Sequence, residues 1–86
     1  MQEFRYVIRD PVGIHARPAG LLVKALKPFA DTEITLSKGE QTVRATQLMR
    51  LMTLGARQGD ELVVRAEGPR ETEAVAAARQ VLEQHL

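Results

Sequence analysis

The residues best suited to chemistry lie within the stretch 13–20, which reads Gly-Ile-His-Ala-Arg-Pro-Ala-Gly. A proline is accepted in the first turn of a helix but not deeper, so Pro18 predicts a helix that begins just before it. His15 would then lie at a helix N-terminus, where the backbone N–H groups of Ala16 and Arg17 have no partner in the helix. Such an arrangement binds anions, and here it contains a nucleophile.

The chemistry expected at His15 is attack on a phosphoryl group. Imidazole titrates near neutral pH, and the partial positive charge of a helix N-terminus disfavours the imidazolium, so the neutral ring should predominate. The negative charge of the product would then meet the helix end and the guanidinium of Arg17. The alternative is that His15 only caps the helix or completes a turn. The residue types alone favour neither interpretation.

Composition limits the possible functions. The 86 residues are enough for one domain, residues 1–86, with a single modest core. There is no cysteine, which excludes a disulfide framework and a thiolate metal site. His85, the second of only two histidines, is expected to be exposed on the fraying end of a helix. We therefore expect no bound metal and no cofactor.

The charge balance and the aromatic content argue against nucleic acid as a partner. Twelve basic and eleven acidic residues give a formal net charge of +1, and the only aromatic side chains are one tyrosine and two phenylalanines. Nucleic-acid bases would therefore find few aromatic side chains on which to stack. The sequence also has no signal-peptide pattern and no apolar run that could span a membrane. These features predict a cytoplasmic protein that does not insert into membranes.

Hydrophobic periodicity predicts the elements that must position His15. Large apolar side chains at every second position indicate a strand over residues 4–9. From Ala16 onward, apolar residues at helical spacing continue to Phe29. Pro28 should push Lys27 out of the helical region and end this helix after about three turns.

The middle of the chain predicts a hairpin and a short helix. Two strands are expected over residues 33–37 and 41–45, with Gly39 in the tight connection. Thr46 is a plausible N-cap for a helix that ends at Leu54. Gly55 suits the left-handed conformation that follows a helix.

The last third predicts one more strand and one more helix. A β-branched run at residues 62–66 indicates a buried strand, and Pro69 is expected at the first position of the final helix. The buried stripe of that helix is predicted to consist of Val75, Ala78, Leu82 and Leu86. The order β-α-β-β-α-β-α predicts an α+β fold in which three helices cover one face of a four-stranded, mostly antiparallel sheet.

Over its whole length the chain resembles HPr, the histidine-containing phosphocarrier family of the bacterial phosphoenolpyruvate-dependent sugar phosphotransferase system. The segments that carry the resemblance are residues 13–19, Lys38-Gly39, residues 48–55 and Gln58-Gly59, in the order and spacing of that family. The resemblance implies an open-faced β-sandwich. It also implies a monomeric phosphoryl-relay protein that is not itself an enzyme.

Residue roles follow from the resemblance. His15 would accept a phosphoryl group on Nδ1 from phospho-Enzyme I and pass it to the EIIA component of a sugar permease. Arg17 would contact the phosphoryl group, and the N–H of Ala16 would lie at the helix end beside it. Such a relay must run in both directions, so a shallow site suits it better than a deep pocket of cations.

The short second helix carries more apolar side chains than it can bury. Leu51 and Leu54 can share one buried face. The apolar side chains left for an exposed docking patch are those of Leu48, Met49 and Met52. The resemblance implies that this stretch docks both Enzyme I and EIIA. Arg50 alone would be a solvated surface charge, but beside an apolar patch it is expected to be a rim contact to acidic partners.

Two positions depart from the family pattern. Many HPr proteins carry a serine, phosphorylated by an ATP-dependent kinase, where this chain has Gln47. Glutamine cannot accept the phosphate, and the hydroxyl of Thr46 is expected to cap the helix, so serine-type regulation is predicted to be absent or altered. Val12 stands where a polar residue often hydrogen-bonds near the histidine, so backbone groups are expected to hold the His15 ring instead.

Three other functions remain possible from the sequence. A hydrolase or acid-base enzyme that uses His15 would need a carboxylate partner, and Asp10 is the only nearby candidate. An RNA-binding or small-ligand regulatory domain would need stacking aromatics or a glycine-rich phosphate loop, which the sequence lacks. A carrier of the nitrogen branch, which phosphorylates regulators instead of sugars, would have the same motif around His15.

Overall fold

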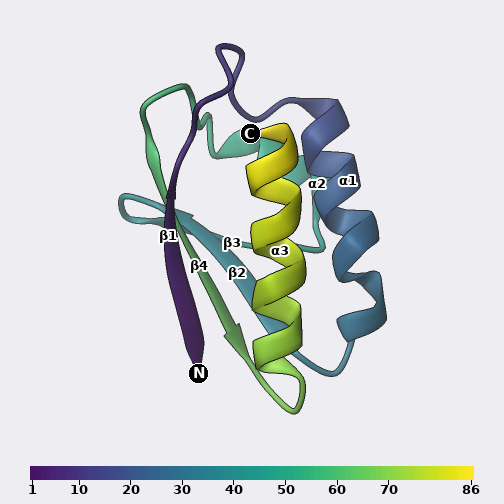
Figure 1. Ribbon diagram of the computed structural model, residues 1–86. Helices are drawn as coiled ribbons and strands as arrows, with labels where there is room; N and C mark the ends of the chain where they lie inside the picture. Colours follow the sequence, from purple (N-terminus) through teal and green to yellow (C-terminus); the bar gives the residue numbers. More distant parts are fainter.

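Four strands and three α-helices follow one another in the predicted order in the computed structural model, which describes residues 1–86 (Figure 1). The elements are β1 (Gln2–Val7), α1 (Ala16–Leu26), a 3₁₀ turn η1 (Lys27–Phe29), β2 (Glu33–Lys38), β3 (Gln41–Arg44), α2 (Leu48–Thr53), β4 (Glu61–Glu67) and α3 (Glu71–His85). None of the helices combines the length and the apolar character needed to cross a lipid bilayer.

The sheet has the strand order β1-β4-β2-β3, and all its neighbouring strands are antiparallel. In its register, Phe4 lies opposite Val64, and Val64 also lies opposite Leu36 on the other side. These three buried side chains form a row across the sheet, which follows from the period-two alternation of their strands.

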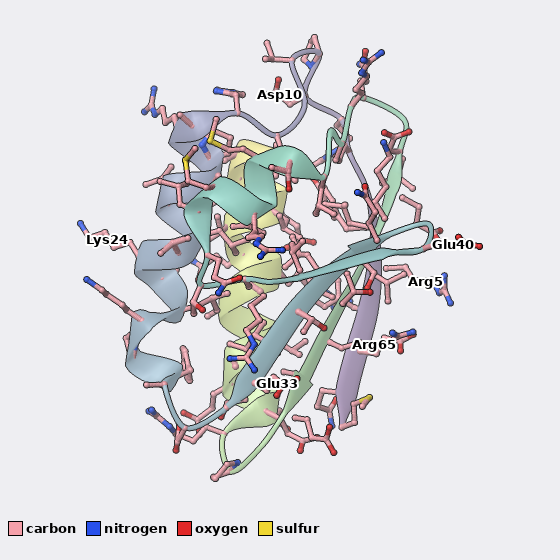
Figure 2. All side chains as sticks on the ribbon, turned by 180° about the vertical axis from the view of Figure 1, so that it is seen from behind. Arg5, Asp10, Lys24, Glu33, Glu40 and Arg65 are labelled. Carbon is pink, nitrogen blue, oxygen red and sulfur yellow. The ribbon has the colours of Figure 1, made fainter.

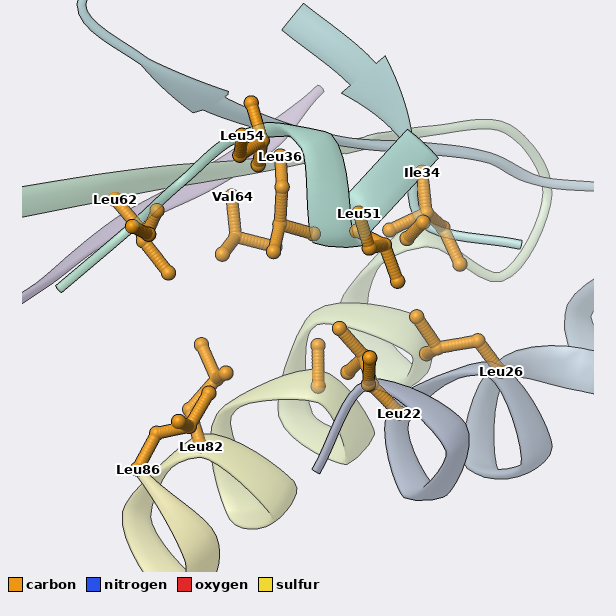
Figure 3. Packing of buried hydrophobic residues seen from close by; sticks show 14 of the residues in the cluster. Leu22, Leu26, Ile34, Leu36, Leu51, Leu54, Leu62, Val64, Leu82 and Leu86 are labelled. Atoms are coloured by element: carbon orange, nitrogen blue, oxygen red, sulfur yellow. The ribbon is translucent and has the colours of Figure 1, made fainter. Parts of the chain in front are cut away.

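The helices cover one face of the sheet. α1 and α3 run side by side in opposite directions, so the start of α1 and the end of α3 lie at the same end of the molecule (Figure 1). Figure 3 shows the core between the layers, where Leu36 and Val64 of the sheet face Leu22 of α1 and Leu82 of α3. Leu51 of α2 and Leu54, the C-cap of that helix, complete this core, and each is at most 2% exposed.

The other face of the sheet is open and charged. Arg65 donates to Glu3 at 2.7 Å and Arg5 donates to Glu61 at 2.9 Å, both pairs joining β1 to β4. Arg5 and Arg65 point away from the helices in Figure 2. Exposed pairs of this kind add little stability, but they keep the open face of the sheet polar.

Three helix boundaries differ from the prediction. Lys27 keeps helical angles, φ −53° and ψ −42°, because the chain continues into the 3₁₀ turn, where Pro28 needs no N–H. α3 starts after the cap Arg70, so Pro69 lies outside the helix and not at its first position. The buried stripe of α3 also differs from the prediction: Ala74 is buried, whereas Val75 is only partly buried.

The start of α2 is the third difference. Gln47 occupies the N-cap position, and no side chain donates or accepts a capping hydrogen bond there. The predicted capping role of Thr46 is therefore wrong. Buried Ala45 still donates its N–H to the Ile34 carbonyl at 2.9 Å, which extends the hairpin pairing by one residue. The chain needs the turn at Thr46 before a helix that buries Leu51 can begin.

Candidate functional site

The helix that carries the candidate nucleophile begins where Pro18 predicts. Ala16 is its first residue and His15 its N-cap, with an extended backbone at φ −134° and ψ −177°. The imidazole makes no capping hydrogen bond, so His15 does not cap the helix through its side chain. The N–H groups of Ala16 and Arg17 have no acceptor within the chain. A half-buried, unengaged ring thus lies beside free backbone donors.

The loop before His15 is held by backbone contacts. Asp10 accepts two bonds, from the N–H of Val12 to its Oδ1 at 2.8 Å and from the N–H of Gly13 to its carbonyl at 3.1 Å. The N–H of Ile14 then donates to the Ala56 carbonyl at 3.0 Å. The side chain of Val12 is 67% exposed and makes no contact that orients His15. The expectation that backbone groups hold the His15 ring instead is wrong, because the imidazole makes no hydrogen bond and only the loop before it is fixed.

A polar hollow of about 280 Å³ opens at this end of the molecule. Its lining residues are Asp10, His15, Arg17, Pro18, Gln84 and His85. His15 and Arg17, paired in the prediction, therefore face one space. The structure gives Arg17 no ion pair and no hydrogen bond through its side chain, so its five donors are free for an anion.

The second histidine is a residue that sequence reasoning missed. His85 was expected on a fraying helix end, but this end of α3 is fixed in place. A main-chain oxygen of buried Leu86 accepts from the N–H groups of Arg9 at 2.6 Å and Asp10 at 2.9 Å. His85 is half-buried and lines the same hollow as His15. No local pattern could have revealed this, because the antiparallel packing of α1 and α3 brings the two rings to one place.

A hydrolytic pair of His15 and Asp10 finds no support in the geometry. Both residues line the hollow, but no hydrogen bond or ion pair joins them, and one oxygen of Asp10 is engaged by Val12. The structure also contains no group of three or more side chains suited to hold a metal ion. A larger hollow, about 490 Å³, lies at the other end of α1, where Lys27, Glu33 and Arg44 mix opposite charges far from His15.

The predicted apolar patch on α2 is exposed. Leu48, Met49 and Met52 are exposed by 38%, 72% and 38%, whereas Leu51 is fully buried. Arg50 and Gln47 are exposed on the same short helix. α2 lies beside the first half of α1 (Figure 2), so this patch is near the helix that carries His15.

The end of α2 is fastened to the hairpin and to the loop before β4. Lys38 donates to the Gly55 carbonyl at 3.2 Å and pairs with Asp60 at 3.3 Å. Asp60 also accepts from the N–H of Arg57 at 2.9 Å. The Arg57 hydrogen bond, followed by the Lys38 ammonium, lowers the pKa of the Asp60 carboxyl below its ordinary value.

Comparison with known proteins gives one family. A family model described as "PTS HPr component phosphorylation site" matches residues 2–84. The phosphocarrier protein HPr of Mycoplasma pneumoniae is 36% identical over 85 residues, which are 99% of this chain and 97% of that protein.

Solved structures agree. HPr-C-His from Thermoanaerobacter tengcongensis aligns with a TM-score of 0.90 and 36% identity, over 98% of this chain and 93% of its own. A histidine-containing phosphocarrier protein from Mycoplasma aligns with a TM-score of 0.92 and 30% identity, over 96% of this chain and 93% of its own. The fold and the resemblance inferred from the sequence are thereby confirmed.

Proposed function

The chain belongs to the HPr family of phosphocarriers of the phosphotransferase system, and on that premise we propose that Nδ1 of His15 is the atom that carries the phosphoryl group. A member of this family is a carrier and not a catalytic enzyme. The observation that supports His15 is its free imidazole at a helix N-terminus whose first N–H groups have no acceptor.

The transfer is a displacement at phosphorus. The lone pair of Nδ1 forms the new N–P bond while the bond from phosphorus to the donor, phospho-Enzyme I, breaks, and the donor keeps that electron pair. The phosphoryl oxygens then meet the guanidinium of Arg17 and the free N–H groups of Ala16 and Arg17. The second step reverses this bond change, with EIIA as acceptor.

The open site suits a group that must leave again. The hollow is wide and polar, and only one permanently charged cation, Arg17, lines it. A deeper cage of cations would stabilise the phosphorylated ground state more than the transition state, and would slow the second transfer. The partner proteins supply the remaining stabilisation in each complex.

The exposed patch on α2 is the proposed docking surface for Enzyme I and for EIIA. Leu48, Met49 and Met52 offer flexible apolar contacts, and methionine suits binding to more than one partner. Arg50 contributes charge at the rim, which speeds encounter with acidic partners. Both partners would approach beside α1, where the His15 ring is accessible.

Serine-type regulation is proposed to be absent. Gln47, at the position of the regulatory serine, has no hydroxyl. Thr46 is exposed and does not cap α2, so the proposal rests on Gln47 alone. Incubation with an HPr kinase and ATP should add no phosphate, and stoichiometric phosphothreonine at Thr46 would contradict it.

The direct test is incubation with Enzyme I and phosphoenolpyruvate, followed by intact mass measurement. Wild type should gain one phosphoryl group that is lost in acid, as phosphohistidine is, and His15→Ala should gain none while keeping its circular dichroism spectrum. A wild-type protein that gains no acid-labile group would refute the proposed function.

A further inference from the structure

We propose that His85 is a second ligand of the phosphoryl group carried by His15, so that the carried group is bound from both α1 and α3. This inference rests on the proposed function, because it needs a phosphoryl group on His15. It assigns a role to a side chain that the sequence suggested was only a solvated helix end.

The first observation is the shared space. His15 and Arg17 reach the hollow from the start of α1, and Gln84 and His85 reach it from the end of α3. The hollow, about 280 Å³, has room for several water molecules and therefore for the three oxygens of a phosphoryl group. A group on His15 that extends into this hollow extends toward α3.

The second observation is that His85 is held in place. A main-chain oxygen of Leu86 accepts from the N–H groups of Arg9 and Asp10, and the Arg9 guanidinium donates to the Glu83 carbonyl at 2.9 Å. The N–H of Leu86 closes the last turn on Leu82 at 2.8 Å. The backbone on both sides of His85 is thus fixed, so binding an anion through its ring costs side-chain entropy but no further ordering of the backbone.

The charges around the hollow show why a hydrogen-bond donor from His85 would help to hold a phosphoryl dianion. Arg17 faces the space with positive charge, and the Asp10 carboxylate faces it with negative charge. Arg9 and Glu83 lie with His85 on the adjoining surface, where Arg9 is engaged by Tyr6 and by the Glu83 carbonyl. A phosphoryl dianion would be repelled by the Asp10 carboxylate and attracted only from α1, by the Arg17 guanidinium and the free N–H groups at the helix start, unless a donor on α3 joins them.

Histidine suits this position because it can donate in either protonation state. A neutral ring offers one N–H, and a protonated ring offers two together with a positive charge. The dianion is therefore held through an N–H bond at any pH and more strongly when His85 is protonated. Such a ligand strengthens binding without making the site a permanent cage of cations.

The test uses protein phosphorylated chemically with phosphoramidate, so it does not depend on Enzyme I. ³¹P NMR follows the second ionisation of the phosphoryl group in wild type, in His85→Ala and in Gln80→Ala, an exposed α3 residue outside the hollow. A donor stabilises the dianion, so its loss in His85→Ala should raise the midpoint of this ionisation by about 0.5 to 1 pH unit. Gln80→Ala should match wild type.

A second readout is the ¹⁵N spectrum of the His85 ring, whose signals should move when His15 is phosphorylated. Equal ³¹P midpoints in wild type and His85→Ala, with unmoved ring signals in wild type, would overturn the inference. A phosphoryl group found on His85 itself, retained in His15→Ala, would also overturn it. Failure of wild type to accept the group from Enzyme I, with the ³¹P difference intact, would instead refute only the proposed relay.

Discussion

Gly13 lies against the backbone of Ala56 so closely that a Cβ atom on it would come within 2.3 Å of the Ala56 carbonyl oxygen. The same carbonyl accepts the N–H of Ile14 at 3.0 Å. The loop that ends in His15 is thus joined directly to the segment that follows α2. This contact connects the proposed phosphorylation site to the segment that follows the proposed docking helix.

Gly13→Ala should lower the free energy of unfolding by about 2 to 4 kcal/mol, because the new Cβ meets backbone atoms and the φ of +79° is unfavourable for alanine. Gly20→Ala is the matched control, since no atom lies within 4 Å of its Cβ and the residue is helical; it should stabilise by about 0.5 to 1 kcal/mol. Urea unfolding measures both. A Gly13→Ala variant as stable as wild type would contradict the close packing.

Leu51→Ala and Met49→Ala should have different effects, because the first removes a core side chain of α2 and the second removes a surface one. Leu51 is fully buried, so its truncation should cost about 2 to 5 kcal/mol. Met49 is 72% exposed, so its truncation should change stability by less than about 0.5 kcal/mol and yet slow phosphoryl transfer from phospho-Enzyme I. Urea unfolding and transfer rates check this pair. Unchanged transfer in Met49→Ala would remove Met49 from the docking surface.

Arg17→Gln should leave the fold intact and weaken phosphoryl transfer by about 10- to 100-fold, the range expected for losing a charged hydrogen bond to an anion. The stability should not change because the Arg17 side chain has no partner in the protein. Lys24→Gln, an exposed cation on the same helix, is the control for net charge. Equal transfer rates in the two variants would mean that Arg17 acts only through the general field.

Stability should fall in acid partly through Asp60. Its pKa is lowered in the folded protein by the Arg57 N–H and by Lys38, so its contribution is complete above the unfolded pKa of about 4. That contribution is lost as the pH falls through the lower folded value. Asp60→Asn should therefore be less stable than wild type at pH 7, and the difference should disappear in strong acid.

The measurement for Asp60 is urea unfolding between pH 7 and pH 2. Glu40→Gln is the control, because Glu40 is exposed at the hairpin tip (Figure 2) and has no ion pair. A pH-independent difference between Asp60→Asn and wild type would show that packing, and not the carboxylate charge, is what the variant changes.

Features of this protein that depend on neighbours along the chain could be read from the sequence. Pro18 placed the start of α1 and so put His15 at a helix end, because the proline ring restricts the first turn by itself. The spacing of Leu51 and Leu54 separated a buried face from the exposed Leu48 and Met49. The alternation of apolar residues likewise gave the strands and the fold class.

Tertiary packing decided the rest. Gln47 and not Thr46 occupies the N-cap position of α2, because the hairpin pairing extends to Ala45. Lys27 stays helical because it is the first residue of the 3₁₀ turn that continues α1. Nothing local relates His85 to His15. They share a hollow because α1 and α3 pack in opposite directions on one sheet face, and the burial of apolar side chains from distant segments sets that direction.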